Sequence, residues 1–276
     1  MANREMTDHY AVIGNPISHS KSPLIHTEFA KQTEQALDYI TREIPLNDLT
    51  AGLKQLQEEG FKGINITVPF KEQAWQIVSD KSDHATRAGA INTIVFNDDG
   101  SLYGDNTDGI GLCRDLVDNH HITLQGKRIL LLGAGGAARG VIEPLLSYQP
   151  SELFIANRTA SKAKDLSALF ADFGTVQGGG FNDLKGRFDV IINATAASLK
   201  GEVPPLPDDI LNSNASCYDM MYSTTDTAFV TWAKQHDAAK TIDGLGMLIE
   251  QAAEAFHLWR GIKPDTKTIT QLIRKQ

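Results

Sequence analysis

Cysteine is scarce in this chain, which contains only Cys113 and Cys217 among 276 residues. The two lie far apart and neither belongs to a CxxC pair, so they form neither a disulfide framework nor a set of metal ligands. We interpret both as small, buried apolar side chains of a protein from a reducing compartment.

Long hydrophobic runs and a surplus of basic residues are also missing. No apolar run approaches the roughly 20 residues of a membrane-spanning helix, and the polar segment 1–10 does not resemble a signal peptide. The 26 Lys and Arg residues are outnumbered by 34 Asp and Glu residues, a net charge of −8 that argues against nucleic-acid binding. We therefore expect a soluble, cytoplasmic protein with neither a membrane nor a nucleic-acid partner.

Several catalytic signatures are absent as well. The sequence has no HExxH motif, no P-loop lysine and no Ser-His-Asp order. These absences leave hydrolase, metalloprotease and kinase functions without support.

The alternation of strand-like and helix-like segments predicts an α/β protein with two domains, joined near residues 106–109. Residues 91–96 and 101–103 flank Asn97-Asp98-Asp99-Gly100 and predict a β-hairpin. We expect further strands at 10–13, 38–44, 63–68, 128–132, 153–157, 190–193, 216–219 and 241–243. Helices are expected to start at Ser22-Pro23, with Ser22 as the cap, and to cover 46–59, 107–119 and 247–260, and residues 133–138 are expected to open a helix that runs to about Leu146.

A glycine-rich loop follows the apolar strand 128–132 and opens a helix. Gly133-x-Gly135-x-x-Ala138 has the spacing and context of a dinucleotide-binding loop. Its glycines permit a tight turn and a close approach to a pyrophosphate, which the helix N-terminus can bind. The alternative is a glycine-rich structural turn.

The segment after the next strand indicates which dinucleotide is preferred. It reads Asn157-Arg158-Thr159 and continues to Lys162, without the acid that would bind a ribose 2′-hydroxyl. Because Arg and Lys suit a 2′-phosphate, the segment favours NADP over NAD. The alternative is a solvated turn in which Thr159 caps a helix.

Lys71 and Asp108 are the candidates for acid–base chemistry. Lys71 starts a helix, where the helix dipole disfavours a cation. Asp108 also starts a helix, and there the simpler explanation is a capping carboxylate. Asn65 and Thr67 share one strand face, Ser20 and Ser22 follow a sharp turn, and Gln251 borders the apolar face of helix 247–260. Each of these has an ordinary structural explanation when taken alone.

Taken together, the motifs of this chain resemble the shikimate dehydrogenase family over nearly its whole length. The matching blocks are Gly14-x-Pro16-Ile17-x-His19-Ser20-x-Ser22-Pro23, Asn65-Ile66-Thr67-Val68-Pro69-Phe70-Lys71, Ala90-Ile91-Asn92-Thr93, Gly104-Asp105-Asn106-Thr107-Asp108-Gly109, Gly133–Ala138, Asn157-Arg158-Thr159, Asn193-Ala194-Thr195, Tyr218-Asp219-Met220-Met221-Tyr222, and Asp243-Gly244-Leu245-Gly246-Met247 with Gln251.

The resemblance implies a two-domain α/β architecture and an NADPH-dependent reduction of 3-dehydroshikimate to shikimate, in the synthesis of aromatic amino acids. It implies an N-terminal substrate domain over 1–107, a Rossmann-type NADP-binding domain over 108–243, and C-terminal helices over 244–276 that complete the first domain. We expect a monomer or homodimer whose partners are small molecules.

The same resemblance assigns site residues. It implies that Lys71 is the acid/base and Asp108 its partner, both beside the substrate. The remaining substrate residues are Ser20, Ser22, Asn65, Thr67, Asn92, Tyr222 and Gln251. The implied cofactor residues are Gly133, Ala134, Gly135, Gly136, Ala137, Asn157, Arg158, Thr159, Lys162, Thr195, Met220 and Gly244.

Two positions depart from the family pattern, and two other functions stay open. Ala196 replaces a usual Ser, and Lys162 stands where NADP-selective members often have Arg. One alternative is a relative that also accepts quinate or NAD. The other is a redox sensor that binds NADP without turnover, since a fold alone does not prove activity.

Overall fold

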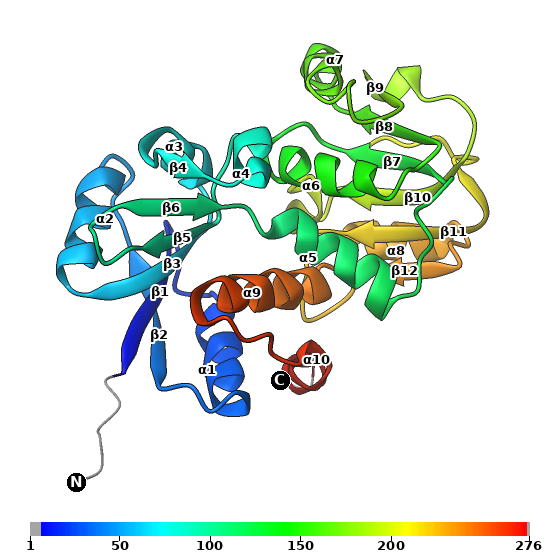
Figure 1. Ribbon diagram of the computed structural model, residues 1–276. Coiled ribbons are helices and arrows are strands. Elements are labelled where there is room, and N and C mark those ends of the chain that lie inside the picture. Colours follow the sequence, from blue (N-terminus) through cyan, green and yellow to red (C-terminus); the bar gives the residue numbers. More distant parts are fainter. Residues whose placement is uncertain (1–6, 275–276) are drawn as a thin grey trace, which may run out of the picture. The chain divides into compact units, whose positions relative to one another are not determined.

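Two six-stranded sheets organise the chain in the computed structural model, which describes residues 7–274 (Figure 1). Residues 1–6 of the polar N-terminal segment lie outside the described residues. The chain divides into two units. Unit 1 runs to Asp108 and resumes at Ile249, and unit 2 covers Gly109–Leu248. The sequence expectation put these boundaries after residues 107 and 243.

The sheet of unit 1 is mixed rather than wholly parallel. Its order is β2-β1-β3-β5-β6-β4. Strand β1 runs parallel to both β2 and β3, whereas β5 is antiparallel to β3 and to β6. The predicted hairpin is thus confirmed as β5 and β6. The strands are β1 Asp8–Gly14, β2 Leu37–Glu43, β3 Phe61–Ile66, β4 Asp80–Lys81, β5 Thr93–Phe96 and β6 Leu102–Asp105.

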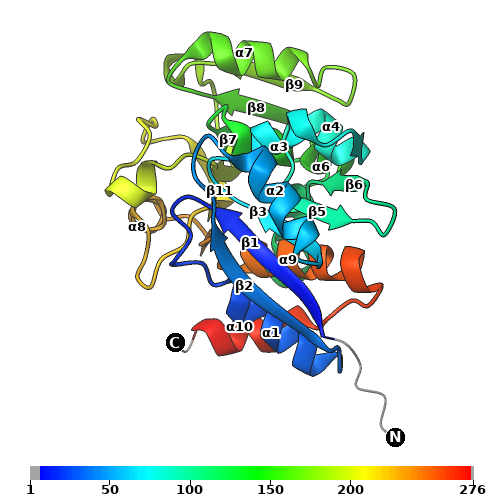
Figure 2. The same cartoon turned by 90° about the vertical axis from the view of Figure 1, so that its left-hand side faces the viewer.

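Helices from both ends of the chain pack on this sheet. Gln32 exchanges two hydrogen bonds with the backbone of Asp265, so α10 lies beside α1 (Figure 2). The indole Nε1 of Trp259 in α9 donates to the carbonyl of Ile94 at 3.0 Å. The helices are α1 Ser22–Gln32, α2 Leu49–Glu58, α3 Lys71–Ile77, α4 Asp83–Ala88, α9 Leu245–Arg260 and α10 Thr266–Arg274.

Two local expectations in unit 1 were wrong. Ser22 is the first helical residue of α1 rather than its cap, because Lys21 occupies that position, and the Ser20 hydroxyl accepts from the Ser22 amide. The second helix begins at Leu49, not at residue 46, since a turn stabilised by the Asp48 amide and the Pro45 carbonyl precedes it.

The sheet of unit 2 is parallel and has the order β12-β11-β10-β7-β8-β9. When the strands are numbered within the unit, this is the 3-2-1-4-5-6 order of dinucleotide-binding folds. The strands stay parallel, and the order in which the chain adds them reverses between β7 and β10. The strands are β7 Arg128–Leu132, β8 Glu152–Ala156, β9 Val176–Gly179, β10 Phe188–Asn193, β11 Leu211–Asp219 and β12 Lys240–Ile242. Strand β9, which contains two glycines, was not predicted from the sequence.

Helices cover both faces of this sheet. Ile129 and Leu131 of β7 belong to one hydrophobic cluster, whereas Leu130 and Leu132 belong to another. All four side chains are buried, as expected for a parallel strand with helices on each side. The helices are α5 Asp108–Arg114, α6 Gly136–Ser147, α7 Ala160–Ala168 and α8 Ala228–Gln235.

The expected helix 107–119 is not uniform. Regular α-helix ends at Arg114, and Asp115–Asn119 form a π-helical turn. The buried Asp115 carboxylate there accepts from the Tyr218 hydroxyl at 2.7 Å and from the Asn119 amide at 3.0 Å. These polar contacts coincide with the change in helix type. Among residues 7–274, no helix has both the length and the apolar character needed to cross a membrane.

Candidate functional site

The polar residues of unit 1 converge because of the strand order. The loops after β1, β3 and β6 leave the same edge of the sheet, and the antiparallel β5 begins at that edge. Ligand sites of open α/β sheets lie at the carboxyl ends of parallel strands. The predicted residues lie around this edge: Ser20 and Ser22 after β1, Asn65, Thr67 and Lys71 at or after the end of β3, Asn92 before β5, and Asp108 after β6.

Lys71 and Asp108 form the central contact of this edge. Nζ of Lys71 donates to Oδ2 of Asp108 at 2.5 Å, and their side chains are 27% and 11% exposed. Lys71 is the first residue of α3, and its unfavourable place in the helix dipole is offset by the carboxylate. The pair therefore has one face toward solvent, where a ligand can reach it.

Asp108 is the first residue of α5, and its backbone amide donates a hydrogen bond to Oδ1 of Asn106 at 3.1 Å. The second carboxylate oxygen of Asp108 accepts from Nδ2 of Asn92 at 2.8 Å. Thr107 donates its backbone amide to Oδ1 of Asn92 at 2.9 Å, which fixes the orientation of the Asn92 amide. The carboxylate is thereby held in one orientation toward Lys71.

Gln251 joins the same group from α9. Its Oε1 lies 3.4 Å from Nδ2 of Asn92 and 3.5 Å from the hydroxyl of Thr107. Residues separated by more than 140 positions therefore meet at one point of unit 1. Sequence periodicity placed Gln251 only at the border of an apolar helix face.

Asn65 is buried and already has protein partners. Its Oδ1 accepts from the Tyr39 hydroxyl at 2.7 Å, while Nδ2 donates to the Thr93 hydroxyl at 3.1 Å and the Asn92 carbonyl at 3.3 Å. Ser22 also lies beside the Tyr39 hydroxyl, and burial raises the pKa of Tyr39 well above its usual value. Tyr39 was not predicted from the sequence, although its position in a strand beside β1 was a possible signal.

Ser20 and Thr67 belong to two neighbouring loops. The amide of Asn15 donates to the carbonyl of Val68 at 3.2 Å, which joins the loop after β1 to the loop after β3. Gly14 allows this approach, since a Cβ there would lie 2.6 Å from Cγ2 of Thr67. Ser20 and Thr67 are both half-buried.

The glycine-rich loop of unit 2 has the geometry of a phosphate-binding turn. Gly133 has a φ of +112°, which disfavours other residues, and space beside Gly135 is open. Helix α6 starts at Gly136, and no side chain caps its first turn. Its free amide groups therefore suit an anion, and they stand where the strand order reverses.

Other predicted cofactor residues adjoin this loop or lie nearby in unit 2. Thr195 follows β10 and approaches Gly133, where an added Cβ would lie 3.2 Å from Cγ2 of Thr195. Gly244 faces the backbone of Met220, and a Cβ at Gly244 would lie only 2.2 Å from the Met220 carbonyl oxygen. The residues of unit 2 thus fit a dinucleotide.

Asn157 and Arg158 line a pocket of about 360 Å³ together with Thr195 and Ala196. Thr159 occupies the cap position of α7, although its side chain makes no capping hydrogen bond. Lys162 is exposed on α7 and is not among the residues lining this pocket.

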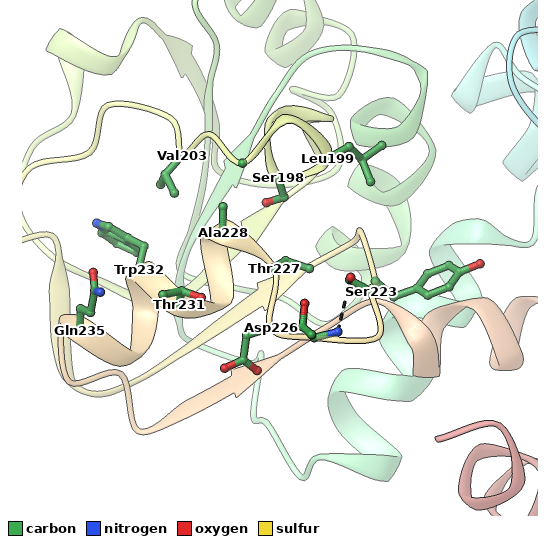
Figure 3. A pocket seen from close by; sticks show the side chains of 13 residues that line it. Ser198, Leu199, Val203, Ser223, Asp226, Thr227, Ala228, Thr231, Trp232 and Gln235 are labelled. Carbon is green, nitrogen blue, oxygen red and sulfur yellow. Dashed lines mark hydrogen bonds between the residues drawn. The ribbon is translucent and has the colours of Figure 1, made fainter. Parts of the chain in front are cut away.

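Tyr222 lies in unit 2, in the segment that follows β11. It lines a pocket of about 610 Å³ whose other walls come from Ser198–Val203 and α8 (Figure 3). Hydroxyl groups of Ser223, Thr227 and Thr231 lie around this pocket, and burial raises the pKa of Tyr222. Within unit 2, Tyr222 is thus near α8.

Asp219 connects the loops after β10 and β11 through its carboxylate, a role that was not predicted from the sequence. Its carboxylate accepts from Ser198 and Thr227 at 2.6 Å each, and from Asn193 at 3.1 Å. Burial raises the pKa of Asp219, while these hydrogen bonds oppose the shift.

Comparisons with known proteins agree with both units. Residues 12–94 match the model of the shikimate dehydrogenase substrate binding domain, 115–200 match shikimate / quinate 5-dehydrogenase, and 244–274 match the shikimate 5′-dehydrogenase C-terminal domain. A shikimate dehydrogenase (NADP(+)) from Hahella chejuensis is 54% identical over 97% of this chain and 99% of its own length.

Solved structures are similar over the same extent. An Ael1 enzyme from Pseudomonas putida has a TM-score of 0.91 and 45% identity, covering 96% of this chain and 98% of that one. Shikimate 5-dehydrogenase from Thermus thermophilus, in complex with NADP(H) and shikimate, has a TM-score of 0.87 and 30% identity. The match covers 98% of this chain and 99% of that chain. By its sequence, its two sheets and its glycine-rich loop, this chain belongs to the shikimate dehydrogenase family.

Proposed function

We propose that this protein catalyses the reversible NADPH-dependent reduction of 3-dehydroshikimate to shikimate, a step in the synthesis of aromatic amino acids. The observation that carries the proposal is the 2.5 Å contact between Lys71 and Asp108 at the ligand edge of the unit 1 sheet. Relatives named shikimate dehydrogenase (NADP(+)) support it at 50–54% identity.

Unit 1 is proposed to bind the substrate and unit 2 the cofactor, with domains at 1–107, 108–243 and 244–276. Hydroxyls and amides of unit 1 that suit a polyhydroxylated acid are offered by Ser20, Ser22, Asn65, Thr67, Asn92 and Gln251, and Tyr222 of unit 2 is a further proposed substrate residue. In unit 2, the proposed cofactor residues are Gly133–Ala137, Asn157, Arg158, Thr159, Lys162, Thr195, Met220 and Gly244. The amides at the start of α6 suit the pyrophosphate, and Arg158 suits the 2′-phosphate.

The chemistry follows from the Lys71–Asp108 pair. When bound, NADPH supplies the hydride that turns the carbonyl carbon of the substrate into an alcohol carbon. Lys71 holds a proton at Nζ and transfers it to the carbonyl oxygen as negative charge develops there, so that the neutral alcohol forms. Asp108, held by Asn92, keeps the ammonium oriented toward that oxygen. In the oxidation direction Lys71 accepts the same proton.

Initial rates test this function. Shikimate oxidation with NADP is expected to be fast, whereas NAD or quinate is expected to give much lower rates. Comparable rates with NAD or quinate would identify the broader relative and direct attention to Ala196 and Lys162. A folded protein that shows no turnover with any combination of these substrates and cofactors would support the redox-sensor alternative instead.

A lysine variant tests the acid/base role. Lys71→Ala is expected to lower kcat by about 10²–10⁴-fold, the usual range for a positioned proton donor. Lys54→Ala is the matched control, because Lys54 is an exposed lysine of α2 in the same unit. Near-normal kcat in a folded Lys71→Ala protein would contradict the proposed mechanism.

We also propose a cytoplasmic monomer or homodimer. Cys113 and Cys217 are buried and unpaired, which suits a reducing compartment, and burial raises the pKa of Cys217 to about 12. Light scattering on the eluting protein is expected to give 30.1 kDa or twice that mass. A larger assembly would contradict this part of the proposal.

A further inference from the structure

Two cations share the pocket that follows β8 and β10. Arg158 reaches it from the end of β8, and Lys200 reaches it from the short 3₁₀ turn Ala197–Lys200. Glu202 is the third charged residue on its wall. The turn ends at Gly201 in the left-handed conformation, with a φ of +72°, which sets where the chain leaves the pocket wall.

Within residues 7–274, neither Arg158 nor Lys200 has an ion-pair or hydrogen-bond partner for its side chain. Arg42, Arg128 and Arg260 differ in this respect, because each pairs with a carboxylate in the same chain. Arg158 and Lys200 outweigh the single carboxylate of Glu202 among the residues that line this pocket, so its charged residues sum to one positive charge. A pocket of that charge suits an anionic ligand group.

We propose that Lys200 is a specificity-determining residue for the cofactor, acting with Arg158 on the 2′-phosphate of NADP. This inference rests on the proposed function. A phosphate monoester carries close to two negative charges at neutral pH, so a single guanidinium leaves much of its charge unneutralised. Arg158 offers a planar fork of donors, and Lys200 adds a compact point charge.

Lys200 is a further candidate partner of the 2′-phosphate beside Lys162, and the two lysines differ in their position. Both are exposed lysines, but only Lys200 lines the pocket that contains Arg158. The difference arises because Lys162 lies on α7, whereas Lys200 returns from the loop after β10. Loop placement, and not distance along the chain from Arg158, thus brings the second cation to the pocket.

Glu202 provides a second test, in which the expected change in affinity has the opposite direction. Its carboxylate repels a phosphate in the same pocket, so removing its charge acts in the opposite direction to removing the charge of Lys200. Lys164→Gln is the matched control, since Lys164 is an exposed lysine of α7 that does not line the pocket.

Calorimetric titration of the full-length protein with 2′,5′-ADP and with 5′-ADP tests this without turnover. Lys200→Gln is expected to weaken 2′,5′-ADP binding by about three- to tenfold, as for loss of one charge-assisted contact, and to leave 5′-ADP binding within about twofold. Glu202→Gln is expected to strengthen 2′,5′-ADP binding, and Lys164→Gln to change neither ligand.

Three results would overturn the role of Lys200. They are unchanged 2′,5′-ADP binding in Lys200→Gln, equal weakening of both ligands, or a larger loss in Lys162→Gln than in Lys200→Gln. Failure of the proposed function looks different, because the unmodified protein would then bind neither nucleotide or would not oxidise shikimate. Tight 2′,5′-ADP binding that depends on Arg158 alone would refute only the role of Lys200.

Discussion

At the scale of single residues, the site of unit 1 depends on side chains that hold other side chains. Asn65 was predicted from its polar character in a buried strand, but its amide orientation is set by Tyr39, Thr93 and the Asn92 carbonyl. Tyr39 is therefore a positioning residue for Asn65 and Ser22, and it does not itself need to touch a ligand.

Tyr39→Phe tests this positioning role. The change removes only the hydroxyl, and loss of one neutral hydrogen bond corresponds to about 1 kcal/mol. We expect the KM for shikimate to rise about three- to tenfold while the KM for NADP stays constant, measured by initial rates. Tyr148→Phe, a partly buried tyrosine of unit 2, is the control. Equal changes in both KM values would indicate a general structural effect instead.

At the scale of elements, α9 reaches the unit 1 sheet only because β3 contains a glycine. A Cβ at Gly63 would lie 2.3 Å from Nε1 of Trp259, the atom that donates to the Ile94 carbonyl. Gln251 lies on the same helix, so its place beside Asn92 depends on this close packing.

Gly63→Ala is expected to push α9 away from the sheet. Overpacking of this kind costs about 1–3 kcal/mol, and displacement of Gln251 adds a rise in the KM for shikimate. Urea unfolding and initial rates measure the two effects. Adding Trp259→Leu removes the clashing ring, so the double variant should lose less than the two single variants combined. Simple additivity would show that the two residues do not interact.

Elements also show where sequence reasoning succeeds and where it fails. The glycine loop between β7 and α6 was predictable because its signal lies in six adjacent residues. The two shortest or most glycine-rich strands, β4 and β9, carry no hydrophobic period and were missed. The π-helical turn at Asp115 was missed because its partner, Tyr218, lies in a distant strand.

At the scale of the whole molecule, stability depends on every group whose pKa differs between the folded and unfolded chain. His26 is fully buried among Phe29, Tyr39, Phe256 and Trp259, and neither ring nitrogen has a hydrogen-bond partner among the described residues. Burial lowers the pKa of His26 from 6.5 to about 3.

This lowered pKa makes the protein sensitive to acid. Between pH 6.5 and about 3 the unfolded chain binds a proton at His26 that the folded chain does not bind, so stability falls as the pH falls. The loss from this group is about 1.4 kcal/mol per pH unit over that range. The raised pKa of Asp219 acts in the opposite sense, because its folded form retains a proton more readily.

His26→Leu is therefore expected to flatten the fall in unfolding free energy between pH 6.5 and 5. A Trp232→Phe background leaves Trp75 and Trp259 as the fluorescent reporters, and both belong to unit 1. Urea unfolding at pH 7.5, 6.0 and 5.0 measures the slope. An equally steep slope in the leucine variant would show that other groups cause the acid loss.

The sequence by itself determined the family, the dinucleotide loop and the identity of Lys71 and Asp108 as candidates. These features are encoded by residue types at short, fixed spacings, and such spacings determine the local backbone conformation without contacts from distant segments. Only the tertiary structure brought Lys71 to 2.5 Å from Asp108, Gln251 to Asn92, and Lys200 to the pocket of Arg158. The reason is that the order of the strands and the positions of the loops depend on packing between distant segments, which no local spacing encodes.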